Sequence, residues 1–290
     1  MAPFPQSYLS PRHLPFNQTA LGGHFQLLPP GVDSDESGLT IVLQKGQVVK
    51  PQRASCGLLC EAPLPEAIRG EETLYFGQWD DRPCRLVSLP GDFLLPAGLE
   101  SQSLMDPAPG VSIEQLSLAG IAQQVAHWHR NSQFCSRCGE PMVWLPIEWG
   151  KQCLGCKVSH FPHIHPCIIV LIWRPGEILL TRKAIWPENR YSLVAGFLDL
   201  GECLEEAVVR EALEETGVSV SQIEYVGSQN WPFPSQLMAG FTARYESGDV
   251  QVEEAELEDA RWFAIDRLPV LPPRRSISRY LIDRFCQQSG

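Results

Sequence analysis

The chain has 290 residues, 44% of them hydrophobic and 20% charged, a composition typical of a globular protein, and its length allows two modest domains or one domain plus a small module. Its formal net charge of −11 excludes a generally basic surface for duplex nucleic acid, so a polyanionic substrate would need metal ions or a few local cations. The N-terminus lacks the segments of a signal peptide, and the longest apolar run, Cys167–Trp173, is too short to cross a bilayer. We therefore expect a cytoplasmic protein without membrane association.

Residues 1–130 show strand and helix patterns but no motif to which a chemistry can be assigned. The first 37 residues are rich in Pro and Gly and predict a loosely ordered lead-in. We expect residues 1–130 to form an α+β scaffold or dimerisation domain. Its predicted elements are a strand at Leu39–Val49, a hairpin made of Thr73–Phe76 and Arg85–Leu89, and a helix with Ser112 as its N-cap.

Four of the ten cysteines form two C-x-x-C pairs, and 14 residues separate the pairs. Because the chain shows no export signal, metal binding is favoured over a disulfide framework. Two such knuckles bring four thiolates together, which predicts a closed, structural zinc site in a zinc ribbon at residues 131–161. The ligands would be Cys135, Cys138, Cys153 and Cys156. A redox dithiol is the alternative interpretation.

The remaining cysteines and the nearby histidines need no metal. Four sulfurs already satisfy a zinc ion, so we expect His160, His163 and His165 to be surface or cleft residues. Most of the scattered cysteines are expected to be small buried apolar residues; they are Cys56, Cys60, Cys84, Cys167, Cys203 and Cys286.

Residues 162–290 alternate strand and helix patterns and predict an α/β sandwich. The continuous apolar run Cys167–Trp173 is typical of a strand that is buried on both faces. The other expected strands are Ile178–Arg182, Tyr191–Ala195, Glu224–Val226, Leu237–Tyr245 and Arg261–Ile265, with a closing helix at Ser276–Cys286.

A glycine loop and an acidic helix occupy Gly196–Val218. The helix is expected to begin near Cys203 and to end at Gly217 as its C-cap, with Val209, Ala212 and Leu213 toward the core. Three carboxylates, Glu211, Glu214 and Glu215, stand at i, i+3 and i+4 and share one face, which suits a hard divalent cation such as Mg²⁺. The alternative is a solvated acidic face with ordinary i,i+4 pairs to Arg210.

The spacing G-x5-E-x7-R-E-x-x-E-E-x-G-V from Gly196 closely resembles the Nudix box, with Ala212 in place of a larger aliphatic residue. The resemblance implies Mg²⁺ or Mn²⁺ at the box glutamates, and Glu215 as the base that deprotonates water. It also implies that Arg210 orients the carboxylates. Further metal ligands would be the Ala195 carbonyl and Glu256, for which Glu253, Glu254 and Glu258 are alternatives.

The order of zinc ribbon, Nudix box and the segment Ser228–Pro234 resembles the NADH pyrophosphatase family of Nudix hydrolases. The family motif has Pro where this chain has Asn230 and Ser where it has Gln236. The resemblance implies a Nudix α/β/α sandwich with a mixed sheet. The substrate-binding residues that it implies are Glu148, Phe161, Phe197, Gln229, Asn230, Trp231, Pro232, Phe233, Pro234, Ser235 and Gln236.

By this resemblance, we expect a homodimer that hydrolyses the pyrophosphate bond of NADH or NAD⁺ to nicotinamide mononucleotide and AMP. The 5′ end of NAD-capped RNA is a further expected substrate. Asn230 and Gln236 keep a second hypothesis open, a Nudix hydrolase of ADP-ribose or diadenosine polyphosphates. A third hypothesis is a nucleotide-sensing or RNA-binding regulator with an inactive Nudix fold, although no box glutamate is missing.

Overall fold

The computed structural model describes residues 4–34, 36–52, 64–106, 110–253 and 255–289, and the chain divides into two compact units. The first unit contains residues 16–164 and 232–235, and the second contains the segment before residue 16, residues 165–231 and the remainder from residue 236. The segment before residue 16 thus belongs to the second unit, whereas the sequence analysis assigned it to the first domain. Cys56, Cys60 and Glu254 lie outside the described residues.

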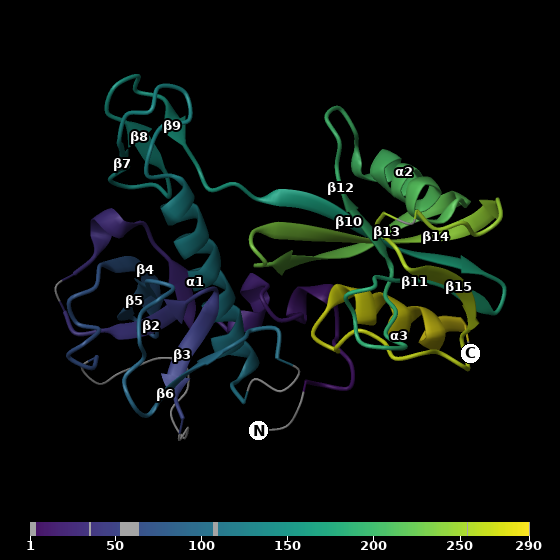
Figure 1. Cartoon of the computed structure of the whole chain (residues 1–290), viewed down its shortest axis with the longest axis horizontal. Coiled ribbons are helices and arrows are strands. Elements are labelled where there is room, and N and C mark those ends of the chain that lie inside the picture. Colours follow the sequence, from purple (N-terminus) through teal and green to yellow (C-terminus); the bar gives the residue numbers. More distant parts are fainter. Residues whose placement is uncertain (1–3, 35, 53–63, 107–109, 254, 290) are drawn as a thin grey trace. The chain divides into compact units, whose positions relative to one another are not determined.

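The first unit is built on a six-stranded sheet in the order β1-β4-β5-β2-β3-β6 (Figure 1). Its one parallel pair, β2 with β5, lies between antiparallel pairs. The helix α1 (Ile113–Asn131) follows it, and the Ser112 side chain accepts a hydrogen bond from the Gln115 N–H, so the predicted N-cap is confirmed. The strands are β1 (Phe25–Leu27), β2 (Leu39–Gln44), β3 (Gln47–Pro51), β4 (Thr73–Trp79), β5 (Arg82–Leu89) and β6 (Leu99–Gln102).

The single strand predicted at Leu39–Val49 is wrong, because this segment forms the two antiparallel strands β2 and β3. Lys45 and Gly46 both have positive φ, 49° and 71°, and turn the chain between them. This backbone conformation is typical of a two-residue hairpin turn, and Gly adopts it without steric cost. The other predicted hairpin is confirmed as β4 and β5.

A three-stranded sheet, β7 (Met142–Trp144), β8 (Lys151–Cys153) and β9 (Ser159–His160), completes the first unit. The Lys151 side chain anchors it to the end of α1. Its Nζ donates to the carbonyls of His129 and Ser132, both at 3.2 Å, and lies over the ring of Trp144 at 4.7 Å. These contacts give hydrogen-bond donors to carbonyls in the last turn of α1 and at its C-cap, Ser132, where no further helical turn follows.

The second unit contains a six-stranded mixed sheet in the order β13-β14-β10-β11-β15, with β12 also paired to β10. The central strands β10 and β14 are parallel, and every other pair is antiparallel. The strands are β10 (His165–Arg174), β11 (Glu177–Arg182), β12 (Val194–Phe197), β13 (Ser219–Trp231), β14 (Gln236–Ser247) and β15 (Asp259–Ala264).

Two helices, α2 (Leu204–Thr216) and α3 (Ile277–Ser289), cover opposite faces of this sheet. Alternate residues of β10 point to opposite sides: Ile168 packs in the core with α2, and Ile169 packs in the core with α3. Both faces are therefore buried, which explains the continuous apolar run. The predicted α/β/α sandwich is confirmed.

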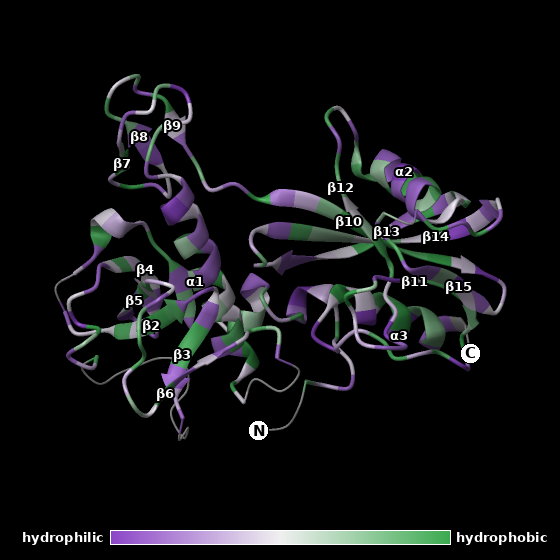
Figure 2. Ribbon diagram, viewed as in Figure 1, coloured by the Kyte–Doolittle hydropathy of each residue, from purple (hydrophilic) through white to green (hydrophobic). Residues whose placement is uncertain are grey.

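Hydropathy follows this layering, with hydrophobic residues along the central strands and mixed residues on α2 (Figure 2). Among the described residues, no helix is long and apolar enough to cross a membrane.

Candidate functional site

A cavity of about 1040 Å³ in the second unit is lined from β10, β11, β12, α2 and the segment before β15. The loop that follows β12 leads into α2. Glu206 closes this turn by accepting a hydrogen bond from the Cys203 N–H at 2.8 Å, and Gly217 ends the helix in the left-handed conformation. The start and end predicted for this helix are confirmed. Its register sets which glutamates face the cavity.

Two of the box glutamates, Glu211 and Glu215, lie on the buried face of α2 at 8% and 3% exposure. They share this face with Val208 and Ala212, which pack in the core. The prediction that Val209 and Leu213 point into the core is wrong, since they are 42% and 52% exposed. Residues 208, 211, 212 and 215 are three and four apart, so one helix face carries both the core contacts and the two carboxylates.

Arg210 connects the carboxylates of this region. Its guanidinium donates to Glu202 at 2.6 and 2.9 Å, to Glu211 and Glu214 at 2.9 Å each, and to the Phe197 carbonyl at 2.8 Å. The glycine loop, β12 and α2 are thereby tied together by one side chain. This geometry supports the orienting role expected for Arg210.

Glu215 is the carboxylate best suited to accept a proton. Burial is the main cause that raises its pKa to about 7; the neighbouring Glu211 and Glu256 act in the same direction, and Lys183 acts in the opposite one. Its Oε1 is buried and has no hydrogen-bond partner in the described residues. An unpartnered buried carboxylate oxygen is costly unless a cation or a water meets it, so the donor set fits a divalent metal.

Gly196 allows the strand β12 to approach the glutamates. A Cβ atom built at this position would overlap the Glu211 carboxylate. Any larger residue would therefore displace a predicted metal ligand, and Ala195 and Gly196 line the cavity beside it. The absence of a side chain at Gly196 thus permits this close approach.

The acidic residues before β15 divide into two groups. Glu253 and Glu256 line the cavity, and Glu256 raises the pKa of both Glu211 and Glu215. Glu258 instead pairs with Arg182 at 2.7 Å. Glu253 and Glu256 therefore remain as the described candidates for the additional ligand.

The cavity brings together eight of the residues that the sequence analysis assigned to the catalytic and substrate sites. They are Ala195, Phe197, Arg210, Glu211, Glu214, Glu215, Gln236 and Glu256. Phe197 is 52% exposed, so its ring is available to a ligand. The clustering of residues from β12, α2, β14 and the segment before β15 was not evident from their separation in the sequence.

Other predicted substrate contacts have different positions. Gln229 is fully buried, donates to the carbonyls of Pro15 and Arg275 at 2.9 and 2.8 Å, and accepts from the Ile277 N–H at 2.8 Å. Its amide is thus hydrogen-bonded to the backbone inside the second unit. The remaining ones are not among the residues lining the cavity: Glu148, Phe161, Asn230, Trp231, Pro232, Phe233, Pro234 and Ser235.

The segment 232–235 belongs to the first unit. There the ring of Phe233 meets Phe16 edge-on, with 5.6 Å between centroids. Pro232 lies so close to α1 that a Cβ at Gly120 would come within 2.9 Å of it. Glu148 and Phe161 also lie in the first unit, both exposed to solvent, Phe161 to 49%.

Sequence reasoning missed several residues that line the cavity, among them Lys183, Trp186, Ser192 and Asp199. Lys183 and Trp186 follow β11, and nothing in their spacing marks them as a motif. One signal was available, because Lys183 is the only lysine among residues 165–290. A lysine that lines an acidic cavity is a candidate for contact with phosphate.

The four cysteines of the ribbon form a second cluster, in the first unit. Their sulfur atoms all lie within 4.8 Å of one another, with 3.4 Å between Cys138 and Cys153 and 3.7 Å between Cys135 and Cys156. A tetrahedral zinc with Zn–S bonds of about 2.3 Å requires sulfur separations of about 3.8 Å. The cluster therefore fits the structural zinc that was predicted. His160 lies nearby, with its Nε2 at 3.8 Å from the Cys135 sulfur.

Hydrogen bonds favour the ionised form of one of these thiols, Cys153. Burial opposes ionisation of Cys153, but the Cys156 N–H and the Cys138 thiol lower its pKa below the ordinary value. A thiolate is the form that binds zinc.

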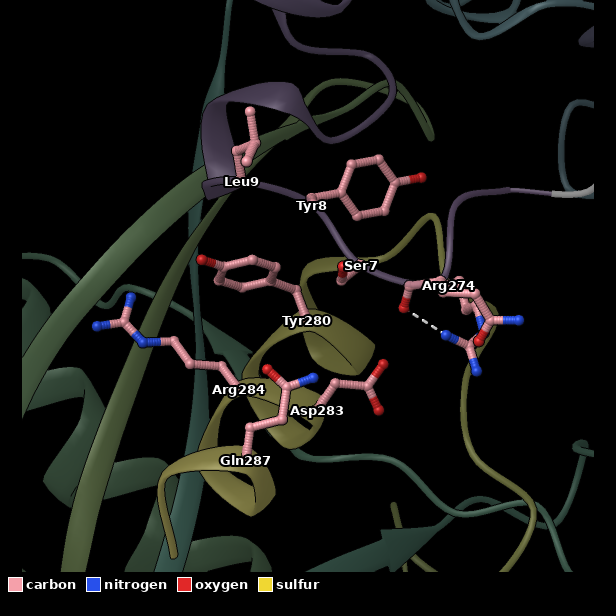
Figure 3. A pocket seen from close by; sticks show the side chains of 9 residues that line it. Ser7, Tyr8, Leu9, Arg274, Tyr280, Asp283, Arg284 and Gln287 are labelled. Carbon is pink, nitrogen blue, oxygen red and sulfur yellow. Dashed lines mark hydrogen bonds between the residues drawn. The ribbon is translucent and has the colours of Figure 1, made fainter.

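A smaller cavity of about 270 Å³ lies in the second unit between the N-terminal segment and α3 (Figure 3). It is lined by Tyr8, Arg274, Tyr280, Asp283 and other residues. Arg274 donates to the Gln6 carbonyl, and Asp283 pairs with Arg279 at 2.7 Å. It contains no residue predicted for the reaction, so the acidic cavity is the candidate active site.

Comparison with known protein families agrees with this arrangement. Residues 163–285 match the NUDIX domain, residues 130–161 the NADH pyrophosphatase zinc ribbon domain, and residues 37–128 the NADH pyrophosphatase-like rudimentary NUDIX domain. The sheet-based domain at residues 37–128 is thus itself of Nudix-like type, which the sequence analysis did not foresee.

Two curated relatives show how far the likeness extends. The NAD-capped RNA hydrolase NudC of Pseudomonas aeruginosa (strain LESB58) is 42% identical over 215 residues, which cover 74% of this chain and 77% of the relative. The NAD-capped RNA hydrolase NudC of Pectobacterium carotovorum subsp. carotovorum (strain PC1) is 37% identical over 249 residues, which cover 86% and 92%. The resemblance inferred from the sequence motifs is confirmed, and this chain belongs to the NudC family of Nudix hydrolases.

Proposed function

We propose that this protein hydrolyses the pyrophosphate bond of NADH and NAD⁺, giving nicotinamide mononucleotide and AMP, and removes NAD caps from the 5′ ends of RNA. The main structural support for this proposal is the acidic cavity. In it Glu211 and Glu215 are buried, and Glu215 Oε1 has no hydrogen-bond partner in the described residues. The substrate assignment is supported by the relatives named NAD-capped RNA hydrolase and by the NADH pyrophosphatase domain matches.

Glu211, Glu214, Glu215, Glu256 and the Ala195 carbonyl would hold Mg²⁺ or Mn²⁺. Such ions, when bound, neutralise the phosphate oxygens and acidify a water molecule. Arg210 keeps Glu211 and Glu214 in place through the hydrogen bonds described above.

Glu215 accepts the proton of the attacking water at its carboxylate. The water oxygen forms a bond to one phosphorus atom as the bridging P–O bond breaks. The bridging oxygen leaves with the other nucleotide, so water and dinucleotide yield two mononucleotides. A carboxyl whose pKa burial raises to about 7 is a stronger base than an ordinary glutamate, which favours this role near neutral pH.

Phe197 would offer a ring face to the nicotinamide or adenine, since it lines the cavity and is half exposed. Gln236 lies at the start of β14 in the cavity lining and would contact the same ligand. Contacts by Glu148, Phe161, Asn230 and the residues 231–235 stay predictions from the family resemblance. Gln229 would act indirectly, because its amide is fully engaged inside the unit.

A second substrate class is ADP-ribose or a diadenosine polyphosphate. It is favoured by Gln236, which lines the cavity at the position where the family motif has serine. A nucleotide-sensing or RNA-binding regulator is a weaker candidate, because every box glutamate is present.

The test compares turnover of NADH, NAD⁺, ADP-ribose, diadenosine tetraphosphate and NAD-capped RNA, with chromatographic identification of the products. We expect nicotinamide mononucleotide and AMP from NADH, 5′-monophosphate RNA from the capped substrate, and a requirement for Mg²⁺ or Mn²⁺. A higher kcat/KM for ADP-ribose than for NADH would contradict the substrate assignment. No turnover of any of these with either metal would contradict an enzymatic function.

The homodimer is also part of this proposal, and light scattering during size-exclusion chromatography would test it. A mass near 65 kDa is expected, twice the 32.4 kDa of one chain. The cytoplasmic location stays a prediction.

A further inference from the structure

The charges that line the acidic cavity are unbalanced. Among the described residues, six carboxylates face it, and only Lys183 and Arg210 contribute positive charge. A dinucleotide pyrophosphate brings two more negative charges to the same space. Cations that contact the phosphates directly should therefore have a large effect on substrate affinity.

Arg210 is not available for that contact. Its three nitrogen atoms already donate to Glu202, Glu211, Glu214 and the Phe197 carbonyl, all within 2.9 Å. These bonds hold its pKa above the usual range of arginine, first through Glu202. A phosphate that recruited Arg210 would have to displace the partners that position the metal-binding glutamates.

Lys183 directly follows β11, and its ammonium is available to bind a ligand. It is half-buried, it lines the cavity, and in the described part of the chain its ammonium makes no hydrogen bond or ion pair. It is close enough to Glu215 and Cys167 for its charge to act on the pKa of both groups. Its side chain therefore faces the part of the cavity where the buried glutamate lies.

Hydrogen bonds hold the backbone around Lys183 in place. The Trp186 N–H donates to the Lys183 carbonyl at 3.0 Å and forms a turn. The preceding side chain, Arg182, donates to the carbonyls of Trp186 and Pro187 at 3.1 and 2.7 Å and pairs with Glu258 at 2.7 Å. A fixed backbone with a flexible ammonium is well suited to follow a phosphate group during the reaction.

We propose that Lys183 is a substrate-binding residue whose ammonium contacts a phosphate oxygen of the dinucleotide pyrophosphate. The inference rests on the proposed function for the identity of the nucleotides, but the contact itself requires only a pyrophosphate linkage. Lys183 therefore serves every dinucleotide pyrophosphate that enters the cavity equally and does not select between nicotinamide and other end groups.

The primary test compares Lys183→Met, which keeps the length of the side chain, with Lys183→Arg, which keeps the charge. With NADH and with ADP-ribose, Lys183→Met should raise KM about tenfold with kcat changed less than about threefold, since a charge-assisted hydrogen bond to the ground state is lost. Lys183→Arg should recover most of the affinity. Lys45→Met, in the exposed turn between β2 and β3, is the matched control and should leave both constants unchanged.

A binding measurement separates substrate contact from other roles. In the Glu215→Gln background, calorimetric titration with NADH and with inorganic pyrophosphate should show about tenfold weaker binding of both when Lys183 is Met. Equal affinities with and without the lysine would overturn the proposal. A shift of the kcat pH profile at unchanged KM would also overturn it, because Lys183 would then act only through Glu215.

Failure of the proposed function would look different. In that case the wild type would prefer another dinucleotide to NADH, yet Lys183→Met would still raise KM for that substrate. The melting temperature of each Lys183 variant, expected within about 2 °C of wild type for a partly exposed side chain, shows that the fold is intact.

Discussion

The cysteine cluster of the ribbon and the acidic cavity, the proposed site of Mg²⁺ or Mn²⁺, differ in how completely their possible ligands are satisfied. In the ribbon, four sulfurs lie at nearly the mutual distances of a zinc tetrahedron, and Cys135 and Cys153 are buried. In the acidic cavity, six carboxylates of the described residues line the space, and among these residues a buried oxygen of Glu215 has no partner. A closed set of ligands holds a fold together, whereas an open set leaves positions for water and substrate.

Neighbouring groups shift the pKa of Cys153 and that of Glu215 in opposite directions. Hydrogen bonds lower the pKa of Cys153 despite its burial, which favours the thiolate that zinc requires at this residue, whereas the pKa of Cys138 is raised. Burial and nearby carboxylates raise the pKa of Glu215 to about 7, so the cavity favours a carboxyl that exchanges a proton. Each prediction below tests one side of this contrast.

The largest expected effect is on catalysis. Glu215→Gln should lower kcat about 10²–10⁴-fold, because general-base catalysis typically contributes that much. Dinucleotide binding measured by calorimetry should be retained. The matched control is Glu205→Gln, an exposed glutamate on the same helix. Turnover of Glu215→Gln within threefold of wild type would show that the cavity has another base.

The next largest effect is expected when a zinc ligand of the ribbon is removed. The free energy of unfolding should fall by several kcal/mol, whereas the catalytic groups are not altered directly. Cys153→Ser should abolish stoichiometric zinc in elemental analysis and lower the thermal stability of the protein, because binding at structural zinc sites contributes about 10–16 kcal/mol in small peptides. Cys203→Ser is the control, since Cys203 is an exposed helix N-cap where serine is well tolerated.

Brief treatment with EDTA sharpens the same comparison. It should stop turnover, which added Mg²⁺ or Mn²⁺ restores, while one zinc per chain stays bound. Wild-type zinc content in Cys153→Ser, or loss of zinc in parallel with activity under EDTA, would contradict the division of roles between the two clusters.

The smallest expected effect concerns pH. Because the folded-state pKa of Glu215 lies above its ordinary value, the folded protein binds this proton more tightly than the unfolded chain. Its contribution to stability is therefore present at low pH and is lost as the pH rises from about 4.5 to about 7. The maximum contribution is on the order of 3 kcal/mol.

Thermal denaturation of metal-free protein measures this effect. Relative to wild type, Glu215→Gln should gain melting temperature between pH 4.5 and 7 and keep a constant advantage of a few degrees above pH 7. Adding Mg²⁺ should reduce that advantage, since the wild-type carboxylate then has a partner. A difference that does not vary with pH would mean that Glu215 ionises at its ordinary pKa in the folded protein.

Much of the fold was predictable from local patterns. The continuous apolar run became β10, buried by α2 on one face and α3 on the other, and the helix ends at Ser112, Cys203 and Gly217 follow from capping chemistry. The strand at Leu39–Val49 was misjudged because alternation continues across a two-residue turn whose positive φ values lie at Lys45 and Gly46. Apolar periodicity alone does not register such a turn.

The positions of site residues were predictable where these residues are close in sequence, and they were uncertain where the residues are far apart. The spacing of Glu211 and Glu215 placed both on one helix face, as the structure shows, but the orientation of that face was wrong for Val209 and Leu213. Gln229 belonged to a recognised motif, yet its amide serves the packing around Pro15 and Arg275. A motif assigns residues to a region without stating which side chains reach the ligand.

Ligand spacing in the chain was enough to predict the cysteine cluster, the acidic helix face and the family, because thiolate knuckles and i, i+3, i+4 carboxylates are local geometry. The fold was needed for everything that depends on contacts between distant segments. Pairing of β10 with β11, β12 and β14, and of β11 with β15, brings Lys183, Gln236 and Glu256 to the same cavity as Glu215. The same burial sets the pKa of Glu215 and leaves its oxygen unpartnered, because desolvation arises only from the whole packed environment.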